Sequence, residues 1–188
     1  MGRWEPDSRG RLQEAALSLY AERGFDQTTA AQIAERAGVT ERTFFRHFAD
    51  KREVLFGGAD ILQERILTGV NDAPKADGPF DAVARGLDAA SEMLGESRRD
   101  LALLRQTVIA SNPELREREL AKLATYAAAV AAALRQRGVN ELQATLAAQV
   151  GMTVFLVAFN QWAEGGDGQD LTLIMRTSFA ELRALAVG

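Results

Sequence analysis

The sequence predicts an all-α fold of about nine helices, and three observations predict it. Apolar residues recur at helical spacing along most of the chain, and no stretch alternates polar and apolar residues as a half-buried strand does. Capping residues and glycines separate the helical stretches. At 188 residues and 47% hydrophobic content, the chain is long enough to bury a core of its own.

The first two helices are delimited by threonines and glycines. An apolar face over residues 12–20 predicts a first helix that ends at Gly24. Thr28 and Thr29 can each cap a second helix, and Gly38 ends it. This second helix is short.

A third short helix follows almost at once, because Thr40 can cap it only two residues after Gly38. Two short helices joined by a glycine turn are typical of a helix-turn-helix. Residues 1–56 are therefore predicted to form a three-helix module of this kind.

A fourth helix is predicted over residues 50–70, as a connection to the rest of the chain. Asp50 and Glu53 have the spacing of a capping box, and apolar residues continue from there to about Val70. The stretch "NDAPKADGP", residues 71–79, is rich in proline, glycine and aspartate and reads as a linker. We expect a second domain over residues 57–188.

The rest of the chain is predicted to be helical. Asn112 and Pro113 form a cap-and-first-turn pair, and the loop "EGGDGQD" separates the last two helices. The expected helices cover residues 80–94, 100–110, 114–137, 140–163 and 170–185.

Composition excludes several kinds of site. The chain has no cysteine, which excludes disulfides, thiolate metal sites and cysteine nucleophiles, and His47 is its single histidine. We therefore expect no metal or cofactor, and no catalytic constellation accompanies His47. Its N-terminal residues do not resemble a signal peptide and its longest apolar run is half a membrane span, so we expect a cytoplasmic protein without a membrane partner.

The third helix carries two kinds of side chain on opposite sides. Residues 36–52 hold five basic and two acidic residues, although the whole chain has a net charge of -4. At about 100° per residue, Phe44 and Phe48 share one side, and Arg42, Thr43 and Arg46 the other. We expect the phenylalanines to anchor the helix and the cationic face to enter a DNA major groove, with Arg46 the first candidate for base reading and Arg42 the second.

Residues 11–56, "RLQEAALSLYAERGFDQTTAAQIAERAGVTERTFFRHFADKREVLF", resemble the N-terminal DNA-binding domain of the TetR family of transcriptional regulators. The resemblance covers about a quarter of the chain and keeps many elements in order and spacing. It implies a homodimer whose C-terminal domain binds a small molecule and controls operator binding. It also implies DNA contacts at several of these positions. The residues expected to contact DNA are Thr28, Thr29, Thr40, Arg42, Thr43, Phe45, Arg46, His47 and Lys51.

Two positions depart from the family pattern. Members often have glycine where this chain has Arg42, and often tyrosine where it has Phe45. The first change adds a possible contact. The second removes a hydroxyl that could bond a phosphate.

The second domain is expected to supply a dimer interface and an effector pocket. The apolar stretch 150–159 and the last helix fit a four-helix bundle with a symmetry mate. Some residues could line a largely apolar pocket, although residues of these types more often serve in packing than in ligand contact: Met93, Arg105, Tyr126, Met152, Phe155, Phe159, Asn160 and Trp162.

The predicted function is a ligand-responsive DNA-binding transcriptional regulator, a repressor that binds a palindromic operator as a homodimer and is released by a small molecule. Repression is the family's habit and is not read from these residues. The alternative is a helical ligand-binding or enzymatic protein whose N-terminal module contacts protein. The salt dependence of DNA binding separates the two.

Overall fold

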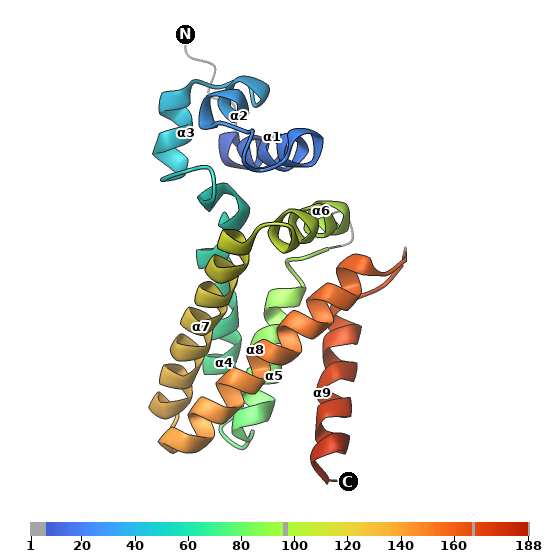
Figure 1. The fold of residues 1–188 in the computed structure, drawn as a ribbon. Coiled ribbons are helices and arrows are strands. Elements are labelled where there is room, and N and C mark those ends of the chain that lie inside the picture. The colour runs from blue at the N-terminus through green and yellow to red at the C-terminus, as the bar shows by residue number, and fades with distance from the viewer. Residues whose placement is uncertain (1–6, 96–97, 167, 188) are drawn as a thin grey trace. The chain divides into compact units, whose positions relative to one another are not determined.

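The computed structural model describes residues 7–95, 98–166 and 168–187, and every regular element in these ranges is helical, as predicted (Figure 1). In chain order the elements are α1 (Ser8–Arg23), α2 (Ala30–Arg36), α3 (Glu41–His47), the 3-10 helix η1 (Glu53–Phe56), α4 (Ala59–Asp72), α5 (Pro79–Ser91), α6 (Arg99–Ala110), α7 (Pro113–Gln136), α8 (Glu141–Glu164) and α9 (Leu171–Val187).

The chain divides into two compact units. The first comprises residues 1–59 and 104–119, and the second comprises residues 60–103 and 120–188. The first unit thus contains the three N-terminal helices together with a later segment that the sequence had assigned to the second domain. The boundary falls inside α6 and inside α7, which both run from one unit into the other.

The helix-turn-helix forms where the sequence predicts it. Thr29 caps α2, and its side chain and that of Gln32 form a reciprocal capping box. Gly38 turns the chain with a φ of 69°, a left-handed conformation that glycine adopts without strain. Thr40 then caps α3 by accepting a hydrogen bond from the backbone N–H of Thr43. The exit from α2 and the entry to α3 are therefore fixed by local chemistry.

The aromatic residues of α3 divide as predicted. Phe44 is fully buried and Phe48 is 4% exposed, whereas Phe45 is 53% exposed. The Phe44 ring meets the rings of Phe45 and Phe48 with centroid distances of 5.2 and 5.8 Å. Two buried rings therefore fix the orientation of α3 on α1 and α2.

The predicted fourth helix is wrong in its first half. Asp50 does accept hydrogen bonds from the backbone N–H groups of Arg52 and Glu53, but only a short 3-10 helix follows. The residues of η1 from Val54 to Phe56 are all buried. Gly58 then adopts a φ of 95°, and α4 begins one residue later.

In the second unit α5, α8 and α9 pack against one another (Figure 1). α8 is the one helix among the described residues that is long and apolar enough to cross a membrane. Its buried residues include Met152, Phe155 and Trp162, so it behaves here as a core helix.

α4 and α5 approach each other closely at two glycines. A Cβ atom on Gly86 would lie 2.6 Å from the carbonyl oxygen of Ile66, and one on Gly69 would lie 2.8 Å from the Cα of Gly86. The two helix backbones therefore touch without an intervening side chain.

Candidate nucleic-acid interface

The outer face of α3 is cationic and carries one exposed aromatic ring. Arg42, Phe45 and Arg46 are exposed, and Thr43 is half-buried. Among the residues that the structure describes, no carboxylate pairs with Arg42 or Arg46, whereas Arg36 of α2 is held by Glu22 at 2.9 Å. The two α3 guanidinium groups are thus available to an external partner.

Hydroxyl groups lie at the N-termini of both helices of the motif. Thr29 and Thr40 are exposed, and each uses its side chain to cap its own helix. A capping hydroxyl at a helix N-terminus stands in the region of positive potential that attracts anions. Both residues therefore remain candidates for phosphate contacts.

His47, at the end of α3, is joined to the start of α1. Its Nε2 atom lies 2.8 Å from the Ser8 hydroxyl and 3.5 Å from an Arg46 nitrogen, and the Arg9 guanidinium lies over the Phe48 ring. Partial burial, followed by the charges of Arg46 and Arg9, lowers the pKa of His47. The positive charges of Arg46 and Arg9 beside His47 favour an anionic partner at this position.

The depressed pKa of His47 predicts a pH-dependent stability. Because the unfolded chain binds this proton more readily than the folded one, the free energy of unfolding should decrease as the pH falls below about 6.5. His47→Gln should remove the decrease, since the chain has no other histidine. Urea unfolding followed by circular dichroism across this pH range measures it, and an equal decrease in the variant would contradict the assignment.

Two of the residues predicted to contact DNA make contacts inside the first unit. Thr28 has no exposed surface, and its hydroxyl donates to the Gly24 carbonyl at 2.9 Å, so it cannot reach DNA in this structure. The Lys51 ammonium donates to the carbonyls of Phe25 and Thr28 at 2.8 and 2.9 Å and lies 4.4 Å from the Phe25 ring centroid. Lys51 therefore joins the α1–α2 loop to the end of the motif.

The predicted pocket residues differ in burial and in the unit to which they belong. Tyr126, Met152, Phe155 and Trp162 are buried in the second unit, while Met93, Phe159 and Asn160 are half-buried there. On α8 the rings of Phe155, Phe159 and Trp162 form a continuous series with centroid distances of 5.8 and 5.6 Å.

The structure does not support the prediction that Arg105 lines the pocket, because Arg105 lies in the first unit. Its Nε atom donates to the Leu55 carbonyl at 2.7 Å, and its guanidinium pairs with Glu119 at 2.8 Å. The same group lies 5.2 Å from the Phe56 ring centroid. These contacts engage Arg105 with η1.

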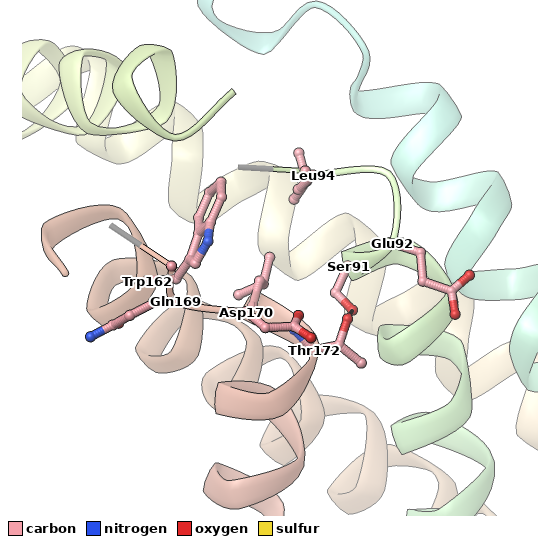
Figure 2. Close-up of a pocket in the computed structure, with 10 residues that line it drawn as sticks. Ser91, Glu92, Leu94, Trp162, Gln169, Asp170 and Thr172 are labelled. Atoms are coloured by element: carbon pink, nitrogen blue, oxygen red, sulfur yellow. Dashed lines mark hydrogen bonds between the residues drawn. The ribbon is translucent and has the colours of Figure 1, made fainter. Parts of the chain in front are cut away.

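A surface cleft of about 400 Å³ in the second unit involves one predicted pocket residue, Trp162 (Figure 2). The side chains of Ser91 and Thr172 meet in it at 2.7 Å. This pair is separated by 81 positions in the sequence, as Ser8 and His47 are by 39, so no local pattern could have revealed either.

Two family models match the chain. The model described as bacterial regulatory proteins, tetR family, matches residues 12–56, and the model of the MftR C-terminal domain matches residues 77–186. The second match covers more than half of the chain.

Individual proteins are similar over different extents. The transcriptional regulator TcmR of Streptomyces glaucescens is 38% identical over 77 residues, which span 41% of this chain and only 34% of that protein. The transcriptional repressor BepR of Brucella suis is 27% identical over 96% of this chain and 94% of its own length. In structure, the regulator FadR of Bacillus subtilis in complex with stearoyl-CoA has a TM-score of 0.63 at 22% identity, covering 92% of this chain and 96% of that chain.

Proposed function

Since this chain belongs to the TetR family of bacterial regulatory proteins, we propose that it is a transcriptional repressor that binds a palindromic DNA operator as a homodimer and is released by a small molecule. The observation that carries the DNA-binding part is the outer face of α3. Arg42, Phe45 and Arg46 face solvent there, while Phe44 and Phe48 hold the helix in the core. The protein works in the cytoplasm and is not an enzyme.

Each side chain of the outer face suits a different part of a DNA duplex. Arg46 and Arg42 can each bond a guanine edge through two N–H groups, and Phe45 can contact the methyl group of a thymine. Thr29, Thr40 and Thr43 suit phosphates, which fix register but not sequence. His47 beside Arg9 and Arg46 suits a further phosphate.

The homodimer is proposed from exposed apolar residues on the last two helices. Leu142, Leu146 and Val157 of α8 are 69%, 53% and 55% exposed and share one helix face, and Leu173 of α9 is 63% exposed. Large apolar side chains exposed in this way favour burial against a second copy through the same surface. Light scattering at micromolar concentration should show a dimer.

The effector is proposed to be largely apolar, because most of the predicted pocket residues of the second unit are apolar. It can act only if it binds one of two dimer conformations more tightly than the other. In the conformation that the effector binds more tightly, the two α3 helices would no longer match major grooves spaced by about 34–36 Å.

Selection of duplexes from a random pool by the purified protein tests this function. We expect the selected duplexes to contain a palindrome. We also expect the logarithm of the affinity to fall against the logarithm of the salt concentration, with a slope of about one unit per phosphate contact. No enrichment, together with weak salt dependence, would favour the alternative in which the N-terminal module contacts protein.

A further inference from the structure

The segment that joins α6 to α7 is part of the first unit. We call residues 104–119 the corner; it comprises the end of α6, the turn, and the first two turns of α7. The Asn112 side chain caps α7 by accepting from the backbone N–H groups of Glu114 and Leu115 at 3.0 and 3.3 Å. Leu115 has no exposed surface. The corner is therefore built into the unit that carries α3.

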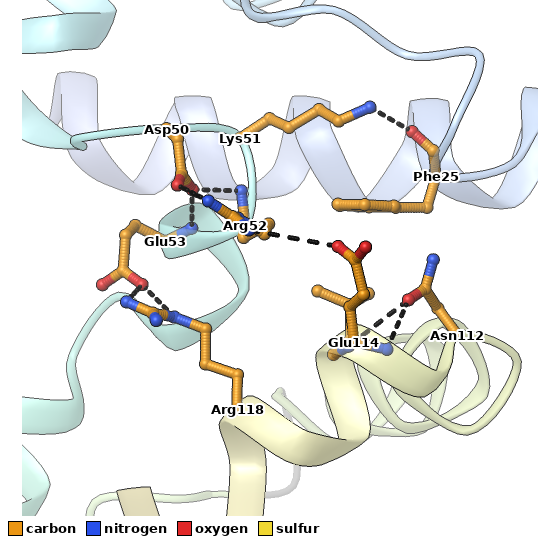
Figure 3. Close-up of polar contacts among 9 residues, drawn as sticks. Phe25, Asp50, Lys51, Arg52, Glu53, Asn112, Glu114 and Arg118 are labelled. Carbon is orange, nitrogen blue, oxygen red and sulfur yellow. Dashed lines mark hydrogen bonds and ion pairs between the residues drawn. The ribbon is translucent and has the colours of Figure 1, made fainter. Parts of the chain in front are cut away.

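Charged side chains hold the corner to the residues just after the helix-turn-helix. We call residues 50–53 the bracket. Glu53 of the bracket pairs with Arg118 of α7, and Arg52 approaches Glu114 at 4.0 Å (Figure 3). Because Glu114 is largely exposed, the second pair is weak and the Glu53–Arg118 pair is the main charged contact. Arg105 strengthens the attachment just beyond the bracket, at Leu55 and Phe56.

The other side of the bracket reaches the start of the helix-turn-helix. The Lys51 ammonium bonds the carbonyls of Phe25 and Thr28, and the Lys51 carbonyl accepts a hydrogen bond from the Tyr20 hydroxyl. Thr28 directly precedes Thr29, the cap of α2. Figure 3 shows Lys51 pointing to Phe25, whereas Arg52 and Glu53 point to the corner. Lys51 thus contacts the loop that begins α2, and the next two residues of the bracket contact the corner.

We propose that the bracket transmits the conformation of α6 and α7 to the DNA-reading helices, with Arg118 and Lys51 as the positioning residues at its two ends. The proposal rests on the proposed function and adds the route of its regulation. α6 and α7 continue as helices into the second unit, so a rearrangement there moves the corner. The connection through α4 is less direct, because Gly57 and Gly58 separate η1 from α4.

Amide hydrogen exchange of the whole chain, measured without DNA, tests whether the bracket couples the corner to α2. Arg118→Glu should speed amide exchange in residues 29–36 by about fivefold or more, because a local opening of the loop before α2 becomes easier. Arg116→Glu is the matched control, since Arg116 is exposed on the same turn of α7. The double variant Glu53→Arg with Arg118→Glu restores opposite charges and should return exchange to the wild-type rate. Arg118→Gln serves if the charge reversal prevents folding.

The outcomes distinguish a bracket that couples the corner to α2 from one that only stabilises the residues in contact. Faster exchange confined to residues 50–56 and 113–119, or equal effects in the control, would overturn the proposal. So would a failure of the double variant to restore residues 29–36.

A second arm uses the operator duplex recovered from the random pool. Because coupling is reciprocal, the duplex should slow exchange in residues 113–119 of the wild type, the control and the double variant, but not of Arg118→Glu. Loss of this difference would also overturn the proposal. If no duplex is enriched, the proposed function fails, while exchange in the free protein still decides whether the bracket couples the corner to α2.

Discussion

Replacing Phe44 by alanine is expected to lower the free energy of unfolding by about 3–5 kcal/mol, the usual cost of truncating a buried phenylalanine. Phe44 is fully buried and its ring contacts those of Phe45 and Phe48. Since a domain is stable by about 5–15 kcal/mol, the change removes a large part of the stability of the DNA-reading unit. Urea denaturation followed by circular dichroism measures it, and binding to the selected duplex should weaken in parallel.

Phe45→Ala is the matched control, because the neighbouring ring is 53% exposed. It should cost much less stability and alter DNA binding without unfolding the protein. Equal destabilisation by the two variants would contradict the division of α3 into an anchoring and a reading side.

Arg46→Ala is expected to reduce sequence discrimination most strongly among the polar substitutions on α3. A guanidinium that bonds a guanine edge contributes about 1–3 kcal/mol of discrimination, so affinity for the selected duplex should fall by about 5- to 150-fold. Affinity for a scrambled duplex of equal length should fall much less, because phosphate contacts supply that binding. Competition titrations with the two duplexes at one salt concentration measure the ratio.

Arg36→Ala controls for the loss of one positive charge. Arg36 lies on α2 of the same motif, but Glu22 and Ser18 hold its guanidinium. Arg36→Ala should lower the affinities for the selected and the scrambled duplex by similar small factors. If Arg46→Ala behaved in the same way, Arg46 would be a phosphate contact and another residue, with Arg42 first, would read the bases.

Local patterns were sufficient for most of the helices and for the two sides of α3. The capping residues Thr40 and Asn140 act within a few positions, and the burial of Phe44 follows from helical periodicity alone. Thr28 and Thr29 stayed equivalent in the sequence, since either could cap α2, and only the fold shows that Thr29 does so while Thr28 is buried.

The errors arose where distant residues or backbone conformation decide the outcome. The capping pattern of Asp50 and Glu53 is real, but only the 3-10 helix η1 follows it, and the left-handed Gly58 precedes α4. Arg105 was assigned to a pocket from its place on a helix, yet its partner Leu55 is 50 positions away. Lys51 was read as a surface cation because its three carbonyl acceptors lie 23–26 positions earlier in the chain.

The contact between Gly69 and Gly86 has a practical consequence for protein engineering. A library that diversifies the second unit to obtain new effector responses should leave both codons fixed, because any added side chain meets backbone rather than a flexible neighbour. Gly95 and Gly166, where a Cβ atom would meet nothing within 4 Å, can be randomised instead. The distance between α4 and α5 is therefore a constraint that an engineered biosensor should preserve.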